Sequence, residues 1–141
     1  LTGCDFAANL PGLGPTKVWQ GRQQLQHCAA TETGLMHTLC LLYLSLFKTK
    51  LGGTVLNEQV RRLSNDTAHD LFASIHQSVQ RGLSFAPRTK QSFWSAARAR
   101  VHVRNVVWTL EYWQTQHDYP DPLQTKYGYE RKNNIVLIAS D

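Results

Sequence analysis

Residues 35–47 form the segment that most restricts how this chain can fold. The segment is apolar on nearly every side of a helix, with only His37, Thr38 and Ser45 as polar interruptions. A helix that is apolar all round has to be covered by protein or by a membrane. Because the stretch is about 13 residues long and a bilayer needs about 20, the sequence predicts a core helix over residues 32–50 rather than a membrane span.

An amphipathic helix is predicted over residues 54–82. Its apolar side chains follow one another at three- and four-residue steps, the spacing that places them on one face of a helix. Thr54 has the side chain of an N-cap, and the pattern stops near Gly82. The stripe consists of Leu56, Val60, Leu63, Thr67, Leu71, Ile75 and Val79.

The longest predicted helix covers residues 89–116, and its apolar side chains occupy two adjoining faces. One face contains Trp94, Ala97, Val101, Trp108 and Tyr112, and the other contains Val106, Leu110 and Trp113. Pro120 and Pro122 end this helix, because proline lacks the N–H donor and disfavours a helical residue before it. The polar tail that follows contains a short β-prone run at residues 135–139, for which the sequence offers no partner strand.

These patterns predict a mainly α fold, a single helical bundle with a short β-prone C-terminal tail. We expect a first helix over residues 15–28, in which Trp19 faces a core, further helices within residues 29–118, and the tail over residues 119–141. The chain does not begin with methionine and ends in an apolar run. We therefore expect residues 1–141 to be a segment of a longer protein.

The net charge of +5 is concentrated in one part of the chain. No acidic residue lies between Asp70 and Glu111, while six basic residues do, namely Arg81, Arg88, Lys90, Arg98, Arg100 and Arg104. Such one-sided charge is typical of a protein that binds a polyanion, although an ordinary solvated helix face has it too. Arg100 and Arg104 are neighbours on a helix, where like charges repel unless an anion lies between them.

The opening residues combine an aspartate with a glycine-marked loop at the start of a helix. Gly12 and Gly14 allow the backbone to approach a bulky anion, and Pro15 suits a first helical turn because its missing N–H would be unpaired there. The unpaired amides after Pro15 and the helix dipole favour a phosphate, and Lys17 lies on the same turn. Together with Asp5, this arrangement predicts metal-assisted handling of a nucleic-acid backbone.

In two short elements the chain resembles the structure-specific 5′ nucleases, the family that includes flap endonucleases and exonuclease 1. Gly3-Cys4-Asp5-Phe6 matches the family's Gly-(Ser or Cys)-Asp-(Tyr or Phe) element. Residues 10–17 match its Gly-hydrophobic-Gly hairpin of a helix-two-turn-helix. The resemblance covers residues 1–28 and implies that this stretch is a helix-two-turn-helix-like motif that binds nucleic acid.

The resemblance implies a role for each matched position. Asp5 is implied to be one catalytic carboxylate of a divalent-metal site that holds Mg²⁺ or Mn²⁺, and the family often joins the hairpin to the duplex through K⁺. The implied nucleic-acid contacts are Gly12, Leu13, Gly14, Thr16 and Lys17, to which the charge pattern adds Arg98, Arg100 and Arg104. A two-metal site needs several carboxylates around ions about 3.5–4 Å apart. The family's other carboxylates lie upstream of this motif, so we expect the segment alone to be inactive.

The sequence therefore predicts a segment of a metal-dependent 5′ nuclease-like protein that binds duplex or junction DNA without regard to base sequence. We expect no membrane and no small-molecule cofactor. Three cysteines at irregular spacing fit a reducing compartment, so a nuclear or cytoplasmic location is expected.

Three other interpretations stay open. The chain could be a non-enzymatic helical domain whose long basic helix packs against a protein partner or an acidic surface. Leu1-Thr2-Gly3-Cys4 spells a bacterial lipoprotein cleavage box, which would make this a trimmed periplasmic lipoprotein, although neither the charged nor the apolar stretch of a signal peptide is present. A zinc site of Cys28, His37 and Cys40 would need Cys4 or His27 as a fourth ligand, and it lacks a Cys-x-x-Cys pair.

Overall fold

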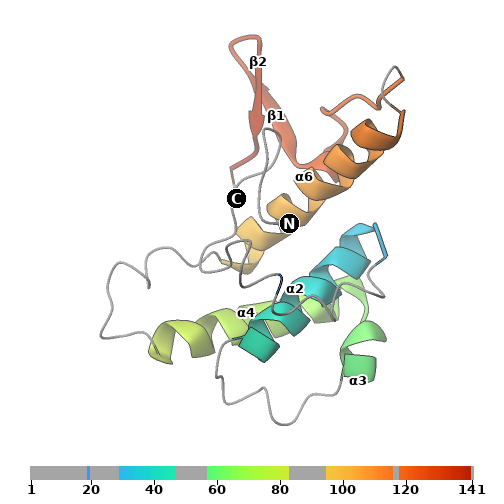
Figure 1. Cartoon of the computed structure of the whole chain (residues 1–141). Helices are drawn as coiled ribbons and strands as arrows, with labels where there is room; N and C mark the ends of the chain where they lie inside the picture. The colour runs from blue at the N-terminus through green and yellow to red at the C-terminus, as the bar shows by residue number, and fades with distance from the viewer. Residues whose placement is uncertain (1–18, 20–28, 47–56, 83–94, 116–117, 141) are drawn as a thin grey trace.

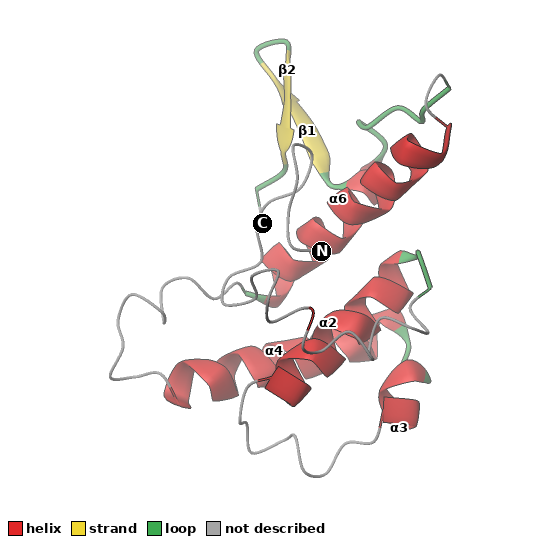
Figure 2. Cartoon of the chain, in the orientation of Figure 1, coloured by secondary structure: helices red, strands yellow, loops and turns green. Residues whose placement is uncertain are grey.

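The computed structural model describes residue 19 and residues 29–46, 57–82, 95–115 and 118–140, and within these the fold is mainly helical (Figures 1 and 2). Its elements are α2 (Glu32–Leu46), α3 (Asn57–Arg61), α4 (Asn65–Gly82), α6 (Ala96–Thr115), the short 3₁₀ helix η2 (Thr125–Tyr127), β1 (Tyr129–Lys132) and β2 (Ile135–Ile138). The predicted fold class is confirmed. The predicted helix over residues 15–28 lies outside the described residues, apart from Trp19.

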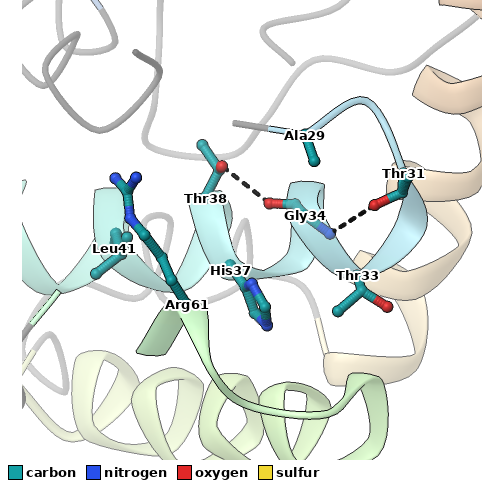
Figure 3. Close-up of a pocket in the computed structure, with 8 residues that line it drawn as sticks. All are labelled: Ala29, Thr31, Thr33, Gly34, His37, Thr38, Leu41 and Arg61. Atoms are coloured by element: carbon teal, nitrogen blue, oxygen red, sulfur yellow. Dashed lines mark hydrogen bonds between the residues drawn. The ribbon is translucent and has the colours of Figure 1, made fainter. Parts of the chain in front are cut away.

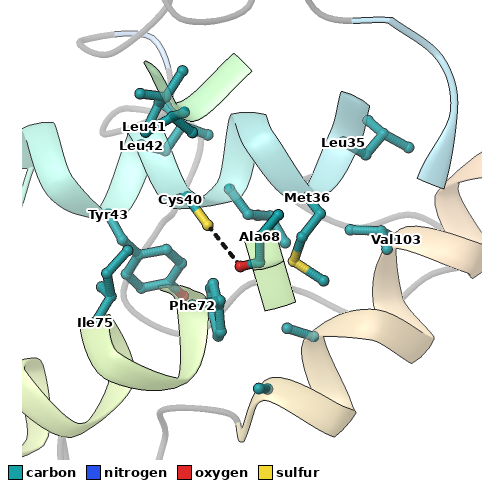
Figure 4. Close-up of a cluster of buried hydrophobic side chains, with 14 of the residues drawn as sticks. Leu35, Met36, Cys40, Leu41, Leu42, Tyr43, Ala68, Phe72, Ile75 and Val103 are labelled. Atoms are coloured by element: carbon teal, nitrogen blue, oxygen red, sulfur yellow. Dashed lines mark hydrogen bonds between the residues drawn. The ribbon is translucent and has the colours of Figure 1, made fainter. Parts of the chain in front are cut away.

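Helix α2 lies at the centre of the hydrophobic core, as the sequence predicts. Met36, Leu39 and Leu42 are fully buried, and α2 packs against both α4 and α6 (Figure 4). Tyr43 meets Phe72 of α4 edge to face, with their ring centroids 5.4 Å apart. Trp19, which was predicted to face a core, is 66% exposed and is not part of this cluster.

Helix α2 begins where the sequence predicts, at Glu32. The Thr31 side chain caps this end, because its Oγ1 accepts a hydrogen bond of 3.0 Å from the Gly34 N–H. The predicted end of the helix, near residue 50, falls outside the described residues.

The prediction of one continuous helix over residues 54–82 is wrong. The described part of this range forms two helices, α3 and α4, with a break at residues 62–64. Ser64 begins α4 as an N-cap, and its Oγ accepts a 3.2 Å hydrogen bond from the Thr67 N–H. The break also changes the buried face. Thr67 is exposed instead of buried, and the core side of α4 is formed by Ala68, Phe72 and Ile75.

Helix α6 begins later than the predicted start at residue 89. Ser95 lies outside the helix and caps it, with its Oγ accepting a 3.2 Å hydrogen bond from the Arg98 N–H. Two of the predicted face residues, Val106 and Trp108, are buried. Ala97 and Trp113 are exposed instead, and Ala99 and Val103 are fully buried in their place. The reason is that α6 packs against α2 and α4 on one side and against η2 on another. The predicted stop before the Pro120 region is confirmed.

The β-prone run at the C-terminus has the partner strand that sequence reasoning missed. β2 pairs antiparallel with β1, in a register that matches Tyr129 with Ile138 and Lys132 with Ile135. Two residues join the strands, and both have positive φ, 53° at Asn133 and 65° at Asn134. Asparagine tolerates this left-handed conformation, and a two-residue turn of this kind matches the twist of a hairpin.

The hairpin is attached to α6 through side chains of the helix. The buried Asn105 carboxamide donates hydrogen bonds of 2.8 Å to the Tyr127 carbonyl and 2.9 Å to the Gly128 carbonyl. Gly128 has a φ of 72°, and a Cβ there would lie only 2.9 Å from Asn105 Nδ2. Trp108 Nε1 donates to the Pro120 carbonyl at 2.9 Å, which fixes the chain after the helix. The tail is therefore an ordered extension of α6.

A test of this packing is the substitution Gly34→Ala in the first turn of α2. Glycine to alanine usually stabilises a helix by up to about 1 kcal/mol. At this position the added Cβ would lie 2.4 Å from the Ala29 carbonyl oxygen. We therefore expect the free energy of unfolding, measured by urea denaturation, to fall by about 1–3 kcal/mol. Gln77→Ala on the exposed side of α4 is the control, and equal stabilities of the two variants would contradict the close approach of residue 29.

Candidate nucleic-acid interface

The residues predicted to contact nucleic acid divide into two groups. The positions of the opening motif, Asp5, Gly12, Leu13, Gly14, Thr16 and Lys17, lie outside the described residues. The three arginines of the basic segment, Arg98, Arg100 and Arg104, lie in the first half of α6 and are partly buried.

A single carboxylate, that of Glu32, connects two of these arginines. Arg104 Nε donates to Glu32 Oε1 at 3.1 Å, and Arg100 Nε lies 3.6 Å from the same oxygen. The Asn65 side chain donates to it as well, at 3.4 Å. Arg100 Nη2 also reaches Asp66 Oδ1 at 3.2 Å.

The positions of the two acidic residues explain why this cluster is favourable. Glu32 is in the first turn of α2 and Asp66 is in the first turn of α4, where the helix dipole favours negative charge. The anion that the sequence requires between Arg100 and Arg104 is therefore a carboxylate of the same chain. The cluster joins α2, α4 and α6, so it has a structural role whether or not a ligand binds.

The side chains of the zinc interpretation that the structure describes take part in packing. The fully buried Cys40 thiol donates to the Ala68 carbonyl at 3.5 Å, and burial raises the pKa of the thiol to about 12. His37 Nε2 lies 2.8 Å from the Leu63 carbonyl oxygen. Among the described residues, no group of three or more His, Cys, Asp or Glu side chains could hold a metal ion.

A polar pocket of about 300 Å³ opens beside the first turns of α2 (Figure 3). Thr31, Thr38, His37 and Arg61 contribute to its wall. Most of these polar groups already have partners within the protein, since Thr31 caps the helix and Thr38 Oγ1 donates to the Gly34 carbonyl at 3.0 Å. These hydrogen bonds leave the pocket with few polar groups for a ligand.

A larger and more apolar groove of about 860 Å³ lies between α6 and the hairpin. It is lined by aromatic rings of α6 and the tail and by apolar side chains of the tail, namely Trp108, Tyr112, Tyr119, Pro122, Tyr129, Val136, Leu137 and Ile138. Sequence reasoning placed Trp108 and Tyr112 on one helix face but did not find the groove. The signal that was missed is Asn133-Asn134, which lies between two β-prone segments and forms the turn of the hairpin. This turn allows β2 to pair with β1, so that Tyr129 and β2 both line the groove.

No helix in the described ranges is long and apolar enough to cross a membrane. No protein-family model, curated protein or solved structure matches the chain.

Proposed function

We propose that this chain is the backbone-binding segment of a metal-dependent, structure-specific 5′ nuclease-like protein, and that it binds duplex or junction DNA without reading base sequence. The observation that supports the proposal is the spacing of Gly3-Cys4-Asp5-Phe6 and the Gly12-Leu13-Gly14 loop at the start of one chain. The two elements place a carboxylate and a phosphate-binding loop within a few residues of each other.

In this proposal the loop and Lys17 bind one stretch of phosphates through backbone amides, a helix N-terminus and one positive charge. The α6 arginines contribute mainly through the local field. Arg100 and Arg104 already bind Glu32 and Asp66, yet the three arginines still exceed the two carboxylates by one positive charge. Direct contacts from this cluster are therefore secondary to those of the loop.

Catalysis is assigned to the complete protein and not to these 141 residues. Asp5 would serve as one carboxylate of a Mg²⁺ or Mn²⁺ site, together with others that the described residues do not supply. K⁺ at the hairpin loop of residues 12–14 would supply positive charge for the DNA backbone. In this proposal the protein acts on nuclear or cytoplasmic DNA.

The test measures binding of the chain to two blunt duplexes of unrelated sequence over a salt range of roughly 50–200 mM. Wild-type affinity should be equal for both duplexes and should fall steeply with salt. Lys17→Glu is expected to weaken binding roughly tenfold or more and to reduce the salt slope by about one. Gly14→Asp should have a similar effect on affinity, because it places a carboxylate in the phosphate-binding loop.

The matched control is Arg62→Glu, which changes the net charge by the same amount at an exposed position between α3 and α4. We expect this variant to lose much less duplex affinity than Lys17→Glu. Equal losses in the two variants would mean that only net charge matters and that the loop is an ordinary turn. A helical protein-interaction domain would then be the better account of the chain.

A further inference from the structure

The groove between α6 and the hairpin has walls made of aromatic rings in fixed positions. Trp108 and Tyr112 are stacked, with centroids 5.1 Å apart and planes 21° apart. Tyr119 and Tyr129 meet Trp108 at near right angles, with centroids at 6.2 Å and 5.7 Å. The hydrogen bond from Trp108 Nε1 to the Pro120 carbonyl holds the central ring. The rings therefore form one connected cluster around Trp108.

The outer part of this arrangement is open to solvent. Tyr119 is 53% exposed, while Trp108 beneath it is only 6% exposed. Opposite the rings, Val136 and Ile138 of β2 contribute an aliphatic wall. The groove volume of about 860 Å³ is large enough for a flat organic group, since small-molecule sites usually measure about 300–1,000 Å³.

The strand register places one charged side chain on the groove side of the hairpin. Arg131 pairs with Val136, so both lie on the same side as Tyr129 and Ile138. Lys132 pairs with Ile135 and lies on the opposite side. The groove is thus an aromatic and aliphatic surface, and Arg131, which does not line it, lies on the same face of the hairpin, nearer the turn.

Two acidic residues, Asp118 and Asp121, are sequence neighbours of the groove residues Tyr119 and Pro122. The Asp121 carboxylate accepts a 3.0 Å hydrogen bond from the Leu123 N–H and so belongs to the turn. Asp118 is exposed beside Tyr119 in the sequence. An anionic ligand would therefore lie with its negative charge toward Arg131 and its neutral part toward the rings.

We propose that this groove binds unpaired nucleobases of a single strand, with a neighbouring phosphate at Arg131. The ligand chemistry follows from the groove. Aromatic rings stack on bases of any sequence, and an arginine compensates the backbone charge. Bases inside a duplex are already stacked and paired, so their faces are closed to these rings. This proposal rests on the proposed nucleic-acid binding. It adds a second binding site, which takes single-stranded nucleic acid, to the duplex-binding site proposed at the opening loop.

The first test compares Tyr119→Ala with Trp113→Ala in the whole chain. Both remove an exposed aromatic ring, 53% and 55% exposed, but Trp113 does not line the groove. Binding of a labelled oligo(dT) strand is measured by fluorescence anisotropy. Tyr119→Ala is expected to weaken binding roughly tenfold, because one stacked ring typically contributes a factor of that size or more. Trp113→Ala should change it less than about twofold, and Tyr119→Phe should retain binding, since the ring remains.

The second test uses the register of the hairpin. Arg131→Gln should reduce the salt slope of oligo(dT) binding by about 0.7, the value for one phosphate on a single strand. Lys132→Gln, which removes an equal charge from the other side, should reduce it less. Thermal unfolding of all the variants checks that the fold is kept.

The outcomes separate this proposal from that for the opening loop. Tyr119→Ala should leave duplex affinity unchanged, whereas Lys17→Glu should lower it. A loss of oligo(dT) binding in Tyr119→Ala supports the groove even if Lys17→Glu has no effect on duplex. Equal oligo(dT) affinities of Tyr119→Ala and Trp113→Ala would overturn it. So would a dimer of the wild type that Tyr119→Ala converts to a monomer in sedimentation, because a second copy would then occupy the groove.

Discussion

Raising the pH from about 9 to 12 is expected to unfold this protein. Burial raises the pKa of the Cys40 thiol from 9.0 to about 12. Burial raises the pKa of Tyr127 from 10.0 to about 12, helped by the Glu111 carboxylate, which accepts a hydrogen bond from the Tyr127 hydroxyl and repels a phenolate there. Burial also raises the pKa of Tyr43. All three groups favour their neutral forms in the folded state.

The direction of the effect follows from proton binding. Below about pH 9 these groups are neutral in both the folded and the unfolded chain. Their ionisation therefore does not lower the free energy of unfolding in that range. Above that pH the unfolded chain loses the protons while the folded chain keeps them, and stability falls as the pH rises toward 12. The Cys40 shift alone corresponds to roughly 4 kcal/mol, which is a large part of the 5–15 kcal/mol typical of a whole domain.

Urea denaturation at a series of pH values between 7 and 12 measures the effect. Cys40→Ala is the informative variant. It should be less stable than the wild type at pH 7 because it leaves a cavity in the core. Its stability should also fall less steeply with pH, because one titrating group has been removed. Parallel pH profiles for the two proteins would show that the buried thiol does not set the alkaline limit.

The sequence predicts the helical elements well where side-chain periodicity alone determines them. Residues 35–47 are apolar on nearly every side, so a helix covered by the rest of the core was predicted, and α2 has that position. The break before α4 was missed because the apolar steps through Val60, Leu63 and Thr67 continue in helical phase across it. Ser64 was the available signal, since serine is a preferred N-cap.

Long-range pairing could not be predicted from local pattern. Glu32 and Arg104 are 72 residues apart in the chain, and no spacing rule links them. From the sequence, Arg100 and Arg104 appeared as two like charges that needed an anion. The two arginines do have an anion between them. Only the packing of α2 against α6 reveals that this anion is the Glu32 carboxylate. A basic segment is therefore a weak indicator of a ligand until its internal partners are known.

The hairpin shows the same limit at shorter range. Its turn could have been recognised, because two asparagines between β-prone segments favour the left-handed conformations found at Asn133 and Asn134. Its attachment to α6 could not, because it depends on a few polar side chains of the helix that bond the tail, and the most buried of them makes two of these hydrogen bonds. That side chain is Asn105, which is fully buried.

Replacing Asn105 by alanine is expected to lower the free energy of unfolding by about 2–4 kcal/mol. The substitution removes both hydrogen bonds from the carboxamide to the tail, and it leaves a cavity between α6 and η2. The Gly128 carbonyl keeps the 3.0 Å hydrogen bond from the Ala139 N–H. The Tyr127 carbonyl loses the donor that Asn105 supplied, and a buried carbonyl without a donor typically costs about 1–3 kcal/mol.

Thr109→Val is the matched control, because Thr109 is also buried on α6, one turn further along. Its Oγ1 donates at 2.9 Å to the Asn105 carbonyl, an oxygen of the helix backbone itself. The loss of that bond should cost less than about 1.5 kcal/mol, the usual net value of one hydrogen bond. Urea denaturation gives the stabilities, and hydrogen exchange of the β1 and β2 amides reports on the hairpin. Asn105→Ala should speed that exchange far more than Thr109→Val does. Equal effects would mean that general packing on α6, and not the Asn105 carboxamide, holds the tail in place.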